Sequence, residues 1–144
     1  MIRYLAFSLT VLLPAVSVAE PPADVKPFQG KWVLSAATLG GRDHTDDYKG
    51  LTLTVTGDKY AVVVGSNTDA GTMTVDAKKS PKWLTLASSE PKGPFKGRTM
   101  PGIYEFTDGK LTVCLNSEKD DRPAKFDAPE KTPVMLFAFE REKK

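Results

Sequence analysis

The sequence predicts an all-β protein built as a single antiparallel barrel of eight strands, with a β-sandwich as the alternative. Beyond residue 28, apolar and polar residues alternate with period two, helical periodicity is nearly absent, and Gly, Pro, Asp and Asn separate the runs. The paired segments have one apolar and one mostly polar face, which is typical of a sheet closed around a core. Short hairpins favour the barrel, because closure removes exposed strand edges.

The N-terminus has the layout of a secretory signal peptide. Arg3 precedes an apolar run at 4–16, and Ser17 and Ala19 are small residues at positions −3 and −1 of a cleavage site. The apolar run is too short for a membrane-spanning helix, which needs about 20 apolar residues. We therefore expect an exported protein, periplasmic or extracellular, that begins near Glu20 and has no membrane span after signal cleavage.

Three segments follow from this interpretation: a signal peptide at 1–19, a Pro-rich leader at 20–27 that we expect to be a flexible tether, and a β-barrel domain at 28–144. The 20 Lys and Arg residues nearly balance the 18 Asp and Glu residues, so charge gives no case for a nucleic-acid partner. The one cysteine cannot form a disulfide within the chain. Apolar burial must hold the core, and we expect a monomer.

The strands are expected where the alternating runs fall. In chain order they are 30–38, 50–56, 59–65, 71–76, 82–88, 102–107, 110–116 and 133–142. Three polar stretches, at 40–50, 88–101 and 117–132, are expected as long loops.

Two hairpins have a predictable register. Gly57-Asp58 suits a two-residue type II′ turn, which places Val55 opposite Tyr60 on an apolar face. Asp108-Gly109 suits a type I′ turn, which places Ile103 opposite Cys114 on the mixed face of its hairpin. A slip of one residue would turn every side chain of a strand to the other face, so these registers define the expected core.

Three segments together resemble a family of small secreted domains, uncharacterised and known mainly from planctomycete bacterial genomes: "FQGKWVLSAA", "KGLTLTVTGDKY" and "GRTMPGIYEFTDGKLTVCLNSEKDDRP". The resemblance covers 28–141. The shared pattern comprises Gly30-Lys31-Trp32, the "KSPKWLTL" strand, Gly102-Ile103-Tyr104-Glu105, and the Cys114 strand leading to Arg122-Pro123. The Gly-x-Trp start also looks like the first strand of lipocalin-type barrels, in which the Trp closes one end. The resemblance implies a fold and a compartment, and it brings no known activity.

His44 is the only histidine and lies near Asp43, Asp46 and Asp47. An imidazole with carboxylates is a possible metal site. Without a second histidine, and without the spacing of a calcium loop, we expect a polar surface loop and no metal. The sequence also lacks a nucleophile elbow, a phosphate loop and a dinucleotide fingerprint, so we expect no catalytic residues, no cofactor and no enzyme activity.

Cys114 and a group of basic loop residues are two further candidate sites. Cys114 has no base near it in sequence, so we expect a structural residue on the strand, beside Ile103. Basic residues of the long loops either bind an anion together or are solvated separately, and solvation is favoured. These basic residues are Lys92, Lys96, Arg98 and Arg122.

Aromatic side chains are the candidate ligand-binding residues of the barrel interior. They are Trp32, Tyr60, Tyr104, Phe106 and Phe137, with Trp83 and Phe139 as further candidates. An eight-stranded barrel is just wide enough to be filled by side chains or to hold one small ligand, and a packed interior is slightly favoured.

The function expected from these observations is a non-catalytic binding module for a small apolar ligand or a protein partner. The alternatives are a purely structural or interaction protein of the cell envelope and, less favoured, an enzyme whose site has an unfamiliar pattern.

Overall fold

The computed structural model describes residues 22–143, so the predicted signal peptide and its cleavage site lie outside the described residues. The strands of this range are β1 (Gly30–Leu39), β2 (Arg42–Asp43), β3 (Thr52–Thr56), β4 (Lys59–Val64), β5 (Asn67–Asp76), β6 (Lys82–Ser88), β7 (Thr99–Thr107), β8 (Lys110–Asn116) and β9 (Val134–Arg141). Two short 3-10 helices, η1 (Ala23–Phe28) and η2 (Asp46–Tyr48), accompany them.

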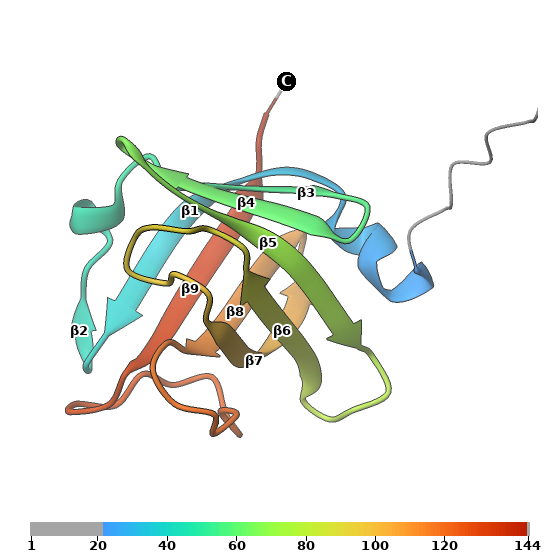
Figure 1. Ribbon diagram of the computed structural model, residues 1–144. Helices are drawn as coiled ribbons and strands as arrows, with labels where there is room; N and C mark the ends of the chain where they lie inside the picture. The colour runs from blue at the N-terminus through green and yellow to red at the C-terminus, as the bar shows by residue number, and fades with distance from the viewer. Residues whose placement is uncertain (1–21, 144) are drawn as a thin grey trace, which may run out of the picture.

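The sheet closes on itself. From β3 to β9 each strand pairs antiparallel with the next, and β1 pairs with both β3 and β9 (Figure 1). The two-residue strand β2 only extends the end of β1, which leaves eight strands around the barrel. The predicted fold class, an all-β antiparallel barrel of eight strands, is confirmed.

All eight predicted strands are present, and their bounds differ most at β5. This strand begins at Asn67, four residues before the expected start at Gly71. Asn67 to Ala70 show no apolar alternation, but they pair with the end of β4, Asn67 opposite Val64 and Asp69 opposite Val62. Asn67 to Ala70 therefore form a strand because they pair with β4, and not because their side chains alternate between apolar and polar.

Both predicted hairpin registers are confirmed. Val55 lies opposite Tyr60 in the β3–β4 pair, and Ile103 lies opposite Cys114 in the β7–β8 pair. Asp108 has a φ of 53° and Gly109 a φ of 75°, the positive values that a type I′ turn requires at both positions.

The prediction of a flexible tether at 20–27 is wrong for the residues from Ala23 onward. These residues form η1, in which Val25 is 2% exposed and Phe28 is fully buried. The ring of Phe28 packs edge-on against Tyr104 and Phe106, with centroids 4.8 Å and 5.0 Å away. The two apolar residues stand three apart, which puts them on one side of a 3-10 helix and seats the helix on the barrel.

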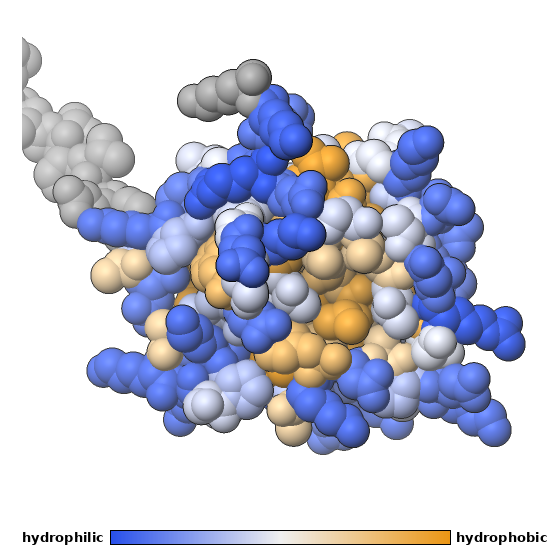
Figure 2. Space-filling model, turned by 180° about the vertical axis from the view of Figure 1, so that it is seen from behind, coloured by the Kyte–Doolittle hydropathy of each residue, from blue (hydrophilic) through white to orange (hydrophobic). Residues whose placement is uncertain are grey.

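The helix η1 closes one end of the barrel. The indole Nε1 of Trp32 donates to the carbonyl of Phe28 at 2.8 Å, and the Gln29 amide bonds to both backbone groups of Gly57 in the β3–β4 turn. The long connections leave from the other end, where η2 and the β6–β7 loop lie. On the face drawn in Figure 2, hydrophobic side chains form a central patch bordered by hydrophilic ones.

Candidate functional site

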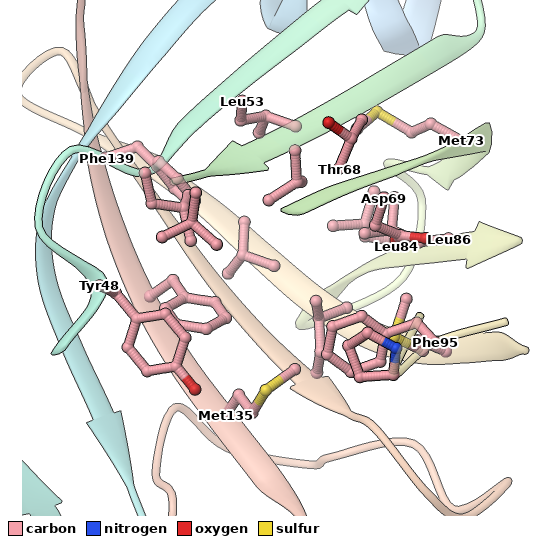
Figure 3. Close-up of a pocket in the computed structure, with 18 of the residues that line it drawn as sticks. Tyr48, Leu53, Thr68, Asp69, Met73, Leu84, Leu86, Phe95, Met135 and Phe139 are labelled. Atoms are coloured by element: carbon pink, nitrogen blue, oxygen red, sulfur yellow. The ribbon is translucent and has the colours of Figure 1, made fainter. Parts of the chain in front are cut away.

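A cavity of about 280 Å³ lies inside the barrel, mainly toward the end opposite η1. Figure 3 shows residues that line it. Strands supply its wall through alternate residues, since every second side chain of a strand points inward. Leu84 and Leu86 come from β6, and Val113 and Leu115 come from β8. Phe28 of η1 forms part of the lining, so the helix that closes the barrel also reaches the cavity.

The cavity reaches the surface between loops. Thr68 and Pro94 line it and are both exposed. Tyr48 of η2 lines it from another side, and its ring meets that of Phe137 edge-on at 5.8 Å. Phe95, in the β6–β7 loop, is half-buried and also lines the cavity. Residues of the loop end therefore form the rim of an opening.

The lining is apolar apart from a few groups, and its single charged side chain among the described residues is Asp69. Tyr60 Oη donates to Asp69 Oδ2 at 2.9 Å, and Ser88 Oγ donates a short hydrogen bond to Asp69 Oδ1. Burial, together with the bond to this carboxylate, raises the pKa of Tyr60 well above its ordinary value. The phenol therefore stays protonated and remains a donor at neutral pH.

The missing side chain of Gly71 makes this arrangement possible. Gly71 lies opposite Tyr60, and a Cβ at this position would overlap the carbonyl oxygen of Ala87 on β6. The close approach of β5 and β6 brings Ser88 within reach of Asp69. Any larger residue at Gly71 would separate the strands that hold the carboxylate.

The five predicted ligand-binding residues lie in three places. Phe137 lines the cavity. Trp32, Tyr104 and Phe106 pack around Phe28 near the closed end, and Tyr60 lies beside the cavity as the partner of Asp69. The interior is thus packed in one half and hollow in the other, and most of the predicted aromatic residues belong to the packed half.

Two further aromatic candidates also separate. Phe139 lines the cavity, whereas Trp83 lies on the outer face of the barrel and is 39% exposed. Trp83 is opposite Ile103, and so shares the outer face with the Cys114 side of the β7–β8 hairpin. Its aromatic character alone does not reveal this position; the register of β6 does.

Sequence reasoning missed the aliphatic lining and Asp69. No sequence pattern distinguishes an inward aliphatic side chain that touches another from one that faces a void. Asp69 fell outside the predicted strand. Extending the β4–β5 pairing to Asn67 would have placed Asp69 on the inward face opposite Val62.

The acidic loop around His44 is not assembled as a metal site. His44 Nδ1 lies 2.7 Å from Asp47 Oδ2, and Asp43 accepts hydrogen bonds from the backbone and hydroxyl of Thr45. These two bonds lower the pKa of Asp43. Within 22–143, no group of three or more histidine, cysteine or carboxylate side chains is placed to hold a metal ion.

Arg98 and Arg122, the two arginines among the candidate anion ligands, donate hydrogen bonds to groups of the protein itself. Arg122 donates to the carbonyls of Leu84 and Gly102 at 2.8 Å and 2.7 Å and to Thr85 Oγ1 at 2.9 Å, while its guanidinium lies 4.5 Å from the ring centre of Trp83. Arg98 donates to the carbonyl of Ser117 at 2.7 Å. Arg122 therefore fastens the segment after β8 to the outside of β6 and β7.

Cys114 lies beneath this fastened segment. Both Cys114 and its opposite residue Ile103 are fully buried on the outer face of the barrel, and the thiol lies 3.5 Å from the carbonyl oxygen of Asp127. The cover is complete because 117–133 folds over the strand. Burial raises the pKa of the Cys114 thiol, which disfavours the reactive thiolate.

No protein-family model and no curated protein matches the chain. Among solved structures, a mutant of the fluorescent protein UnaG is similar, with a TM-score of 0.44 and 14% identity over 83% of this chain and 99% of that one. None of the helices in the described part of the chain has the length and apolar character needed to cross a membrane. The barrel itself defines the class: a small antiparallel β-barrel with an internal apolar cavity.

Proposed function

We propose that the protein is a non-catalytic binding module that holds a small apolar ligand in its barrel cavity. The observation that carries this proposal is a cavity of about 280 Å³, walled by aliphatic and aromatic side chains and reaching the surface between loops. Its volume is just below the range of typical ligand pockets, about 300–1,000 Å³, so the ligand is small.

Apolar burial would drive the binding. Each Å² of ligand and cavity surface removed from water contributes about 25 cal/mol, and cavities walled by apolar side chains hold water poorly. The wall lies on strands fixed by hydrogen bonds on both sides, so little ordering of the protein is needed when the ligand enters.

Adjacent residues of β4 offer a matched test. Val64 lines the cavity, whereas Val63 points outward and is 38% exposed. Titration calorimetry with octanol should show saturable binding to the wild type and to Val63→Phe. In Val64→Phe the added ring fills part of the cavity, and affinity should fall by about tenfold or more, equivalent to about 1.4 kcal/mol. Circular dichroism would verify that both variants fold. Absence of octanol binding to the wild type, or equal binding by both variants, would contradict the proposal.

We also propose that the protein is exported. Support comes from Arg3, the apolar run at 4–16 and the small residues Ser17 and Ala19, and from the resemblance to secreted planctomycete domains. N-terminal sequencing of protein recovered from its own cells should give a chain beginning near Glu20. An intact Met1 on protein from the cytoplasm would contradict export.

A further inference from the structure

We propose that the cavity prefers an apolar ligand that carries an ammonium group over one that carries a carboxylate, with Asp69 as the counter-charge. This inference rests on the proposed function, since it assigns the ligand class of the same cavity. Of the described residues that line the cavity, Asp69 is the only carboxylate, and none is Lys, Arg or His.

Asp69 has acceptor capacity to spare. Its two oxygens each accept one hydrogen bond, from Tyr60 Oη and from Ser88 Oγ. An ionised carboxylate offers about four acceptor positions, so roughly half remain for a ligand. Both partners are neutral hydroxyl groups that orient the carboxylate without cancelling its charge. No cation of the described chain forms an ion pair with Asp69.

The surroundings add to the negative potential. Glu90 lies near enough for its charge to contribute to the raised pKa of Tyr60, as Asp69 also does. Lys92 and Lys96 belong to the same loop as Phe95, but they are exposed and do not line the cavity. A carboxylate inside the cavity would therefore meet Asp69 without a compensating cation, and charges interact strongly where water is partly excluded.

For a ligand with an ammonium group, the electrostatic interaction with the cavity is favourable. The ammonium group is attracted to Asp69 and can donate to the remaining acceptor positions, while the alkyl chain of the ligand occupies the volume walled by Leu84 and Leu86 (Figure 3). Hydrogen bonds from a charged donor to a carboxylate are roughly twice as strong as neutral ones. The cavity thus combines an apolar wall with one oriented anion on its side.

Three probes of eight carbons each test the inference: octylamine, octanol and octanoate, titrated calorimetrically at neutral pH. In the wild type, octylamine should bind more tightly than octanol, and octanoate more weakly than octanol, each by about tenfold. Asp69→Asn keeps the shape of the side chain and one acceptor oxygen, while its NH₂ group faces the other hydroxyl. Because the charge is removed, the three affinities should converge. Glu105→Gln, which removes one negative charge from an exposed outer position, should keep the wild-type order.

The outcomes separate the two proposals. Binding of octanol without preference for octylamine in the wild type, or a preference that survives in Asp69→Asn, would overturn the ammonium inference and leave the apolar binding module standing. Failure of all three probes to bind the folded wild type would overturn both. The wild-type comparison decides the inference by itself where Asp69→Asn does not fold.

Discussion

The guanidinium of Arg141 lies over the indole of Trp32, 4.2 Å from the ring centre, and donates to the carbonyls of Gln29 at 2.8 Å and Pro27 at 2.7 Å. The end of β9 is thereby fastened to the helix η1 at the start of the described chain. Because Trp32 also donates to Phe28, one cluster unites η1, β1 and β9 at the closed end of the barrel.

Arg141→Ala should lower the free energy of unfolding by about 1–2 kcal/mol, since it removes two hydrogen bonds from a charged donor and a cation–π contact at a partly solvated site. Arg141→Lys should also lower the free energy of unfolding, because an ammonium group does not reproduce the planar fork of the guanidinium. Urea denaturation midpoints measure the change. Lys110→Ala breaks only an exposed ion pair with Glu140 and should cost about 0–1 kcal/mol. Equal effects of Arg141→Ala and Lys110→Ala would contradict the role of the cluster.

Phe28→Ala should be among the most destabilising substitutions in the closed half. Phe28 is fully buried against two aromatic rings, and truncation of such a residue costs about 3–5 kcal/mol. Phe106→Ala should cost less, because Phe106 is only half-buried. Thr54→Ala, on the outer side of β3, should stay within about ±0.5 kcal/mol. Denaturant midpoints of the three variants settle this order, and a mild effect at Phe28 would mean that η1 does not seat on the barrel in solution.

Arg122→Gln should expose the thiol of Cys114. Arg122 fastens 117–133 to β6 and β7, and that segment covers Cys114. The rate of reaction with a thiol reagent in native buffer should rise by about tenfold or more, since each 1.4 kcal/mol of weakened cover increases the open population tenfold. Lys125→Gln changes an exposed residue of the same segment and should leave the rate unchanged. A thiol that reacts as slowly in Arg122→Gln as in the wild type would show that other contacts hold the cover.

Stability should fall at alkaline pH. Burial raises the pKa of Cys114 above its ordinary 9.0 and those of Tyr60 and Tyr104 above 10.0, so the folded state favours the protonated forms. The resulting stabilisation is fully present below these ordinary values, and it is lost as pH rises, because the unfolded chain then ionises first. Urea midpoints measured from neutral pH upward should fall once pH 9.0 is passed.

Cys114→Ala removes one of these titrations and supplies the control. Its midpoint should fall less steeply with pH between 9.0 and 10.0 than that of the wild type, whatever its stability at neutral pH. A flat profile for the wild type throughout the alkaline range would contradict the raised pKa values.

The strand pattern of the sequence predicts most of the barrel because period-two alternation and turn residues are local. The type I′ turn at Asp108-Gly109 fixes the pairing of Ile103 with Cys114, and closure follows from eight strands of this kind. The helix η1 was missed because Pro22 precedes it and Pro27 lies inside it, between Val25 and Phe28, and because its structure depends on the barrel end against which Phe28 packs.

The cavity was harder to predict than the fold. An inward leucine looks the same in sequence whether it meets a neighbouring side chain, as Leu111 does in the fully buried core, or faces a void, as Leu115 does. Asp69 belongs to the cavity wall because β5 pairs with β4 as far as Asn67. The polar residues of this stretch carry no sequence pattern that predicts the pairing. The aromatic residues predicted as ligand contacts lie mostly in the packed half, whereas the wall of the hollow half is mainly aliphatic.

The most direct measurement of the central claim is a methyl-resolved NMR titration of the protein with octanol. Methyl signals of Leu84, Val113 and Leu115, which line the cavity, should shift and saturate together at one ligand per chain, while those of Val63 on the outer face stay in place. Shifts confined to Val63, or no saturable shift at the cavity methyls, would contradict the account of the barrel as a binding module.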